Sequence, residues 1–203
     1  MNHLKTMGLF GIVAIAVGMV GFNAVNANPA GVADDVKSNT GEKSTFLGHI
    51  IVTVRDPEGH IKAYRQTDNI VTAIGHNCAA NLLFGTGFAN CTGPATFQYI
   101  ALTNSSITPG AGDTTLTGEQ VNGGMQRQAG TITAAQVATG GTNVAIAQIA
   151  KTFTYTGTNS RTVAASGLFD ASSTGNMFAD HVFSTVTLNT NDQLTVQWQI
   201  TLS

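Results

Sequence analysis

Charged side chains are scarce in this chain. Asp, Glu, Lys and Arg make up 10% of its 203 residues, well below the roughly 25% of an ordinary soluble domain. The 9 basic residues form no cluster, so the concentrated positive surface that neutralises nucleic-acid phosphates is missing. Nucleic acid is therefore not among the expected partners.

Reaction motifs are missing as well. The sequence has no HExxH-type pair of histidines and no GxSxG nucleophile turn. The Gly-rich stretches "NGGMQ" and "TGGTN" lack the strand before and the helix after that a phosphate-binding loop needs. We interpret His49 as a solvated strand residue and His76 as a residue of a helix's first turn. We therefore expect no catalytic residue, no cofactor and no enzymatic activity.

The first 27 residues have the pattern of a secretory signal peptide. Lys5 precedes an apolar run, and the small residues Val25 and Ala27 mark a cleavage point after Ala27. A retained membrane anchor is the alternative, but the run is about 16 residues long and a spanning helix needs ~20. The pattern predicts a secreted or cell-surface protein without a retained membrane span. A flexible segment over 28–44 and a single domain over 45–203 would follow.

Only two cysteines occur, Cys78 and Cys91. In an oxidising compartment an even number of cysteines usually pairs, which favours a disulfide over two free thiols. A metal site is a further alternative, but His76 is the sole extra ligand nearby, and zinc sites usually show two closely spaced ligand pairs.

The rest of the chain is patterned mainly for strands. Threonine, with 29 residues, and glycine, with 23, favour pleated surfaces and turns. The sequence "DPEG" at 56–59 fits a type I turn between two alternating runs and predicts a hairpin over 46–66. Six further segments read as strands: 96–104, 124–137, 143–156, 161–169, 176–188 and 193–202.

One segment has apolar residues at helical spacing instead of the alternation of a strand. Apolar residues between Ile74 and Leu83 recur at helical spacing, and Gly85 fits the position after a helix C-cap, so we expect a short helix near residues 73–84. In 193–202 strict alternation puts Trp198 on an apolar face, as a core anchor, and Gln197 on the polar face. The fold class predicted is mainly β, an antiparallel β-sandwich of jelly-roll-like form.

Few side chains suggest a site. Asp170, Asp180 and His181 flank the turn of "SGLFDASSTGNMFADHVFS" and are weak candidates for a divalent metal site, since carboxylates suit hard cations. Asn104 heads an Asn-Ser-Ser glycosylation acceptor and is preferred to Asn90, whose acceptor overlaps Cys91. A lone charge at a strand start, Arg127, is interpreted as structural.

Three stretches together resemble a known type of module. They are "DNIVTAIGHNCAANLLFG", "YIALTNSSITPGAGDTTLTGE" and "GLFDASSTGNMFADHVFSTVTLNTNDQLTVQWQITLS". Their "GLF" strand, "MFA" strand and terminal "D-x-L-T-V-x-W" strand resemble a β-rich module of phage or archaeal-virus tail and virion proteins, and secreted surface proteins of ammonia-oxidising archaea. The resemblance covers roughly 49–203. It implies an extracellular or virion structural role and brings no catalytic residues with it.

We therefore expect a secreted structural or adhesive protein, with a coat or filament subunit as one form. The alternative is an extracellular glycan- or receptor-binding module like those of phage tails. The expected partner is protein, including a second copy of the chain, or a surface glycan. Weakly charged segments at 127–140 and 143–156 are candidate edge strands, and residues 28–54 are a candidate for strand addition to a neighbour. Alternatively, 45–54 pairs within its own sandwich.

Overall fold

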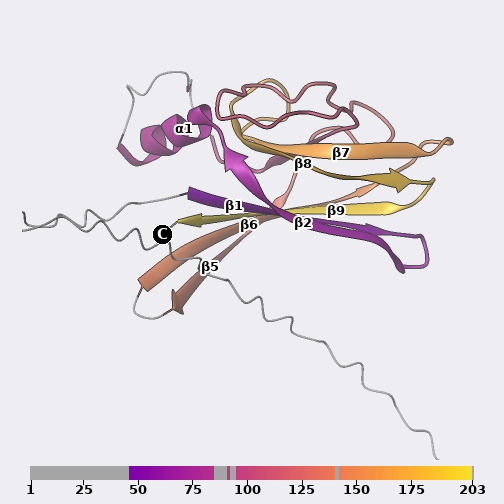
Figure 1. The fold of residues 1–203 in the computed structure, drawn as a ribbon, viewed down its shortest axis with the longest axis horizontal. Helices are drawn as coiled ribbons and strands as arrows, with labels where there is room; N and C mark the ends of the chain where they lie inside the picture. Colours follow the sequence, from indigo (N-terminus) through magenta and orange to yellow (C-terminus); the bar gives the residue numbers. More distant parts are fainter. Residues whose placement is uncertain (1–45, 85–90, 92–94, 140–141, 203) are drawn as a thin grey trace, which may run out of the picture. The chain divides into compact units, whose positions relative to one another are not determined.

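The computed structural model describes residues 46–84, 91, 95–139 and 142–202 (Figure 1). The predicted signal peptide and the segment 28–44 lie outside the described residues. The elements are β1 Phe46–Arg55, β2 Ile61–Val71, α1 Ala73–Phe84, β3 Tyr99–Thr103, β4 Gln128–Ala129, β5 Thr131–Thr139, β6 Thr142–Thr154, β7 Arg161–Phe169, β8 Met177–Leu188 and β9 Gln193–Leu202.

All strand pairs are antiparallel, and the strands follow one another in the order β4-β3-β7-β8-β2-β1-β9-β6-β5. The order folds into two layers, a five-stranded sheet of β2, β1, β9, β6 and β5 and a four-stranded sheet of β4, β3, β7 and β8. Apolar side chains from both layers form one core. The predicted class, a mainly antiparallel β-sandwich with one short helix, is confirmed.

The last strand shows how alternation becomes packing. Trp198 is fully buried and lies in register between Ile50 of β1 and Ile149 of β6, so a row of large apolar groups crosses three strands. Gln197 and its polar neighbours on β9 lie on the outer face and are half-buried. The predicted face assignment and the role of Trp198 as a core anchor are both confirmed.

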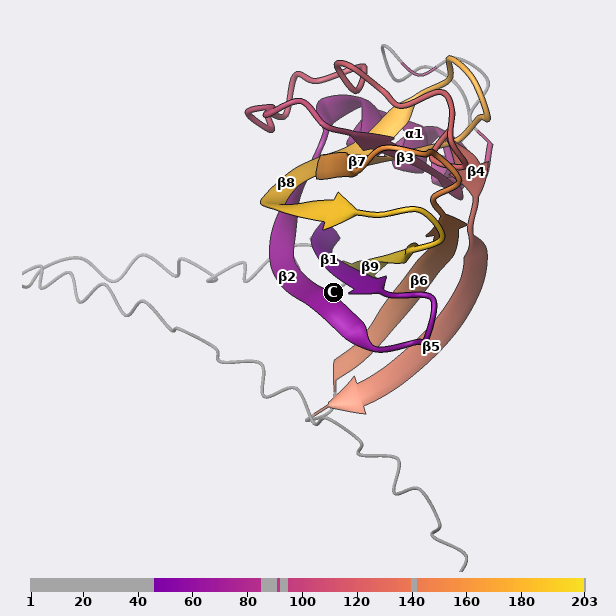
Figure 2. The same cartoon turned by 90° about the vertical axis from the view of Figure 1, so that its right-hand side faces the viewer.

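Two segments of chain join the layers at opposite sides (Figure 2). β2 pairs with β1 along most of its length and with β8 only at Ile70 and Val71. On the other side, β4 pairs with β3, and β5 pairs with β6 directly after Gly130. At Gly130 the backbone passes so close to β6 that a Cβ would lie 2.9 Å from the carbonyl oxygen of Ala150. The single strand predicted over 124–137 is therefore wrong, because the chain changes sheets there.

Of the two segments predicted to be edge strands, only one lies at an edge of the sheet. β5 is an edge, as predicted, but β6 lies between β9 and β5. β1 is paired on both sides, with β2 and with β9, over nearly its whole length. It therefore has no free edge for a neighbouring sheet, and the alternative in which this strand pairs within its own sandwich is correct.

The helix occupies the predicted residues. The hydroxyl of Thr72 caps it by accepting a hydrogen bond from the backbone N–H of Gly75 at 2.9 Å, and donates to the carbonyl of Met177 at 2.6 Å. Gly75 is required by close approach to β8, since a Cβ would lie 2.3 Å from the carbonyl oxygen of Phe178. No helix in the described part of the chain has the length and apolarity to span a membrane.

The long connection between β3 and β4 covers the outer face of the four-stranded sheet (Figure 2). Its Leu116 and Ile107 pack on a second apolar cluster made by Ala101, Phe169 and Met177. Both faces of β7 are therefore buried, and residues Val163–Phe169 form an unbroken buried run. A polar side chain that lies beneath this connection, such as that of Asp180, is buried between the sheet and the connection.

Candidate functional site

The turn between β7 and β8 is held by its first carboxylate. Asp170 accepts hydrogen bonds from the backbone N–H of Asn176 at 2.7 Å and from its side-chain amide at 2.6 Å. The residue is 6% exposed, and the N–H of Ala95 approaches its second oxygen at 3.5 Å. Asp170 therefore stabilises the turn between β7 and β8.

Arg127 ties this turn to the connection between β3 and β4. Its guanidinium donates two hydrogen bonds to the carboxylate of Glu119, at 2.9 and 2.5 Å, and two to the carbonyls of Ala171 and Thr174, at 3.1 and 2.7 Å. The same group lies 3.5 Å over the ring of Phe169. The interpretation of Arg127 as a structural residue agrees with these contacts.

The three weak metal candidates do not form one cluster. Asp180 lies opposite Gly167 and its neighbour His181 opposite Ser166, so the two side chains point to opposite faces of the sheet. Asp170 lies beyond them in the turn. His181 faces the core side, where its Nδ1 has no hydrogen-bond partner in the described part of the chain, and burial lowers the pKa of its imidazole. The predicted grouping is therefore wrong.

Asp180 instead meets a residue that sequence reasoning did not select. It points to the outer face, is 2% exposed, and its Oδ1 has no hydrogen-bond partner among the residues that the structure describes. The side chain of Asp113, from the covering connection, lies within hydrogen-bonding reach. Burial, with Asp113 adding to it, raises the pKa of Asp180 to about 7. The two carboxyl groups line a cavity of about 190 Å³.

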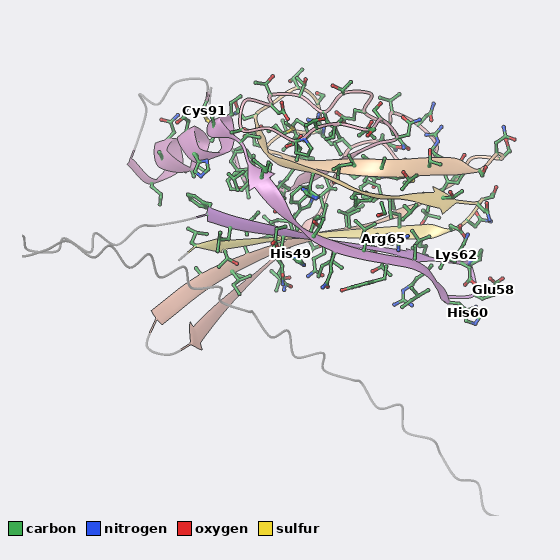
Figure 3. The ribbon with its side chains drawn as sticks, viewed as in Figure 1. His49, Glu58, His60, Lys62, Arg65 and Cys91 are labelled. Atoms are coloured by element: carbon green, nitrogen blue, oxygen red, sulfur yellow. A yellow bond between two sulfur atoms is a disulfide. The ribbon has the colours of Figure 1, made fainter. Side chains whose placement is uncertain are left out.

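A second acidic group lies at the exposed turn between β1 and β2. Ligand atoms of Asp56, Glu58 and His60 all lie within 4.8 Å of one another. Glu58 and His60 lie at the tip of this hairpin (Figure 3). Asp56 accepts hydrogen bonds from the backbone N–H of His60 at 2.8 Å and from the turn's Gly59 N–H, through its carbonyl, at 3.0 Å. Its carboxylate also lies 3.0 Å from Nδ1 of His60. These contacts close the predicted type I turn.

The cysteines form the predicted disulfide. Cys78, fully buried in α1, is bonded to Cys91, with 5.2 Å between the Cα atoms (Figure 3). The bond anchors the segment after the helix to the helix itself. Neither sulfur is available as a metal ligand or nucleophile.

A polar hollow of about 390 Å³ lies near the start of β7. Arg161 borders it, with its guanidinium 5.5 Å over the ring of Tyr155 and donating to the carbonyl of Asn122 at 3.1 Å. Asn104, the predicted glycosylation residue, is exposed and lines the same hollow. Amide, hydroxyl and guanidinium groups dominate the lining: Asn104, Thr158, Asn159, Ser160, Arg161 and Thr162.

The described residues thus offer the carboxyl pair of Asp113 and Asp180, a polar hollow and an acidic turn. Asp113 was missed because no pattern in the sequence links a loop residue to a strand residue so far along the chain. Compared with protein-family models, curated proteins and solved structures, the chain gives no significant match to any of them.

Proposed function

We propose that this protein is a secreted, non-enzymatic structural or adhesive surface protein whose copies associate through the edge strand β5. The signal-peptide pattern and the resemblance to virion and archaeal surface modules favour this role. The proposal places the self-contact at β5, since β1 is enclosed by its own sheet.

The observation that carries the proposal is the composition of that edge. β5 pairs with β6 on one side, and no strand of the described chain pairs with its other side. Residues Thr131–Thr139 include neither a charge nor a proline, the devices that usually prevent edge-to-edge pairing. The first four side chains are exposed, and Ile132 is 41% exposed although it points toward the core face. Such an edge is suited to adding a strand from a second copy.

The outer face of the five-stranded sheet also fits an interface. Its central rows are uncharged: Thr53, Thr195 and Thr152 lie side by side, and the hydroxyls of Thr195 and Thr152 are 2.8 Å apart. The next row places Ile51 beside Gln197. Charged residues are depleted at the cores of protein interfaces, and this face meets that condition.

Negative-stain imaging and light scattering of the purified protein test the proposal. Filaments or larger oligomers are expected, and Thr133→Lys should shift them toward monomer because it places a charge on the free edge. Thr185→Lys, at an exposed position on β8, is the matched control and should leave assembly unchanged. A monodisperse monomer at all concentrations, or equal effects of both substitutions, would contradict the proposal.

Glycan binding is a second candidate function, favoured by the polar hollow beside Arg161. Its volume lies within the roughly 300–1,000 Å³ of ligand pockets, and its hydroxyl and amide groups match the hydrogen-bonding needs of a sugar. Retention of the monomer on a sugar column, abolished by Asn159→Ala but kept by Thr185→Lys, would support this function. An N-linked glycan on Asn104 would cover the hollow, so glycosylated material should bind less.

A further inference from the structure

Buried Asp180 and half-buried Asp113 form a pair of carboxyl groups that none of the contacts described above explains. Asp180 comes from β8, the strand of the four-stranded sheet that pairs with β2, and Asp113 comes from the connection that covers this sheet. Two ionised carboxylates within hydrogen-bonding reach of each other repel. The burial of Asp180 strengthens the repulsion because its surroundings screen the charges poorly. Something must offset that cost when both groups are ionised.

The described side chains supply no counter-charge. The ion pairs among the described residues join His49 with Asp68, His60 with Asp56, Lys62 with Asp192, and Arg127 with Glu119. None of these cations is paired with Asp113 or Asp180. A cation from solution would neutralise the ionised pair.

The environment of Asp180 points to a ligand. The residue is 2% exposed, and its Oδ1 is buried without a hydrogen-bond partner while the carboxyl group lines the cavity. Buried polar atoms nearly always have a partner, so an unpartnered carboxylate oxygen facing an open volume needs an explanation. One oxygen of Asp113 is fixed by the backbone N–H of Gly110 at 2.7 Å, which holds that carboxylate in place at the cavity.

Apart from Ile107, the other residues that line the cavity carry hydroxyl groups. They are Ser106, Thr108, Thr115 and Thr117. Calcium takes about six to eight oxygen ligands in flexible geometry, whereas magnesium demands a smaller, near-octahedral site. A cavity of about 190 Å³ bordered by carboxylates and hydroxyls fits the former.

We propose that Asp113 and Asp180 bind a calcium ion, which clamps the connection between β3 and β4 onto the four-stranded sheet. Because two carboxylates are the only charged groups among the described lining residues, the affinity belongs to the weak range of extracellular calcium modules, with Kd about 10⁻⁴–10⁻³ M. The site is independent of the β5 edge and of the polar hollow, so it stands or fails separately from the proposed function.

Thermal unfolding of the purified protein, with a chelator or with calcium chloride alone as the probe, tests the proposal. At a concentration about 100 times Kd, Tm should rise by about 5–10 °C for a domain of this size. Magnesium at the same concentration should give a clearly smaller rise. An equal rise with magnesium, or none with calcium, would overturn the proposal, and in the latter case the two carboxyl groups share a proton instead.

Four substitutions locate the ion. Asp180→Asn and Asp113→Asn should each abolish the calcium-dependent rise, and in chelator Asp180→Asn should be at least as stable as the parent because the repulsion is gone. Asp68→Asn, at an exposed carboxylate, and Glu58→Gln, at the acidic turn, should keep the full rise. Loss of the rise with Glu58→Gln and its retention with Asp180→Asn would move the ion to the hairpin turn and refute the site.

Discussion

Replacing Arg127 with lysine tests how much one side chain contributes to the contact between the β3–β4 connection and the β7–β8 turn. The arginine makes a bidentate ion pair with Glu119, two bonds to carbonyls of the β7–β8 turn and a stacking contact with Phe169. Lysine keeps the charge but loses the fork and the planar stack. Hydrogen bonds to charged groups contribute about 1.5–3 kcal/mol and a partly desolvated cation–π contact about 1–2 kcal/mol.

Because these contributions are not additive, and Glu119 is 23% exposed, we expect a net loss of about 2–4 kcal/mol, or a Tm lower by about 4–16 °C. Urea unfolding followed by circular dichroism measures it. Arg55→Lys is the control, because exposed Arg55 donates one bond, to the carbonyl of Gly59 at 2.8 Å, and should cost less than about 0.5 kcal/mol. Equal losses in the two variants would refute the reasoning.

Three further outcomes are expected. Trp198→Ala should cost about 3–5 kcal/mol and Gln197→Ala less than about 1 kcal/mol in chemical unfolding, and similar costs would mean that both faces of β9 are buried alike. Non-reducing mass spectrometry should give a linked Cys78–Cys91 peptide, and reduction should lower stability by about 3 kcal/mol; freely alkylated thiols in fresh protein would contradict this. In chelator, the unfolding free energy should fall as pH rises from 3.8 to about 7, because Asp180 is protonated in the folded chain and ionised in the unfolded one over that range. A flat profile in that window, or an unchanged slope in Asp180→Asn, would exclude Asp180 as the cause.

Most of the fold could be predicted from patterns among residues that are close in sequence. The hairpin turn at 56–59, the helix at 73–84 and the alternation of 193–202 each depend on neighbours in sequence, and each appears where it was predicted. The disulfide followed from the number of cysteines and the expected compartment. In all four cases the deciding physics acts within about a dozen residues.

The errors arose where distant segments decide the outcome. Gly130 looked like an interior strand residue, and only the crowding against Ala150 of β6 shows why the chain turns from one sheet to the other there. Asp180 was grouped with Asp170 and His181, its neighbours along the chain, because the approach of Asp113 depends on how a long loop lies over the sheet. Neither contact leaves a periodic signal in the sequence.

The position of β9 has a consequence for the timing of folding. β1 begins at residue 46 and β6 ends at residue 154, yet the strand that joins them covers residues 193–202. During synthesis, the ribosome must release this segment before the five-stranded sheet can form, and pairing of such distant residues is slow because the loop between them must close first. In a chain that passes through an export channel, β1 and β6 would likewise be joined only after residues 193–202 had emerged.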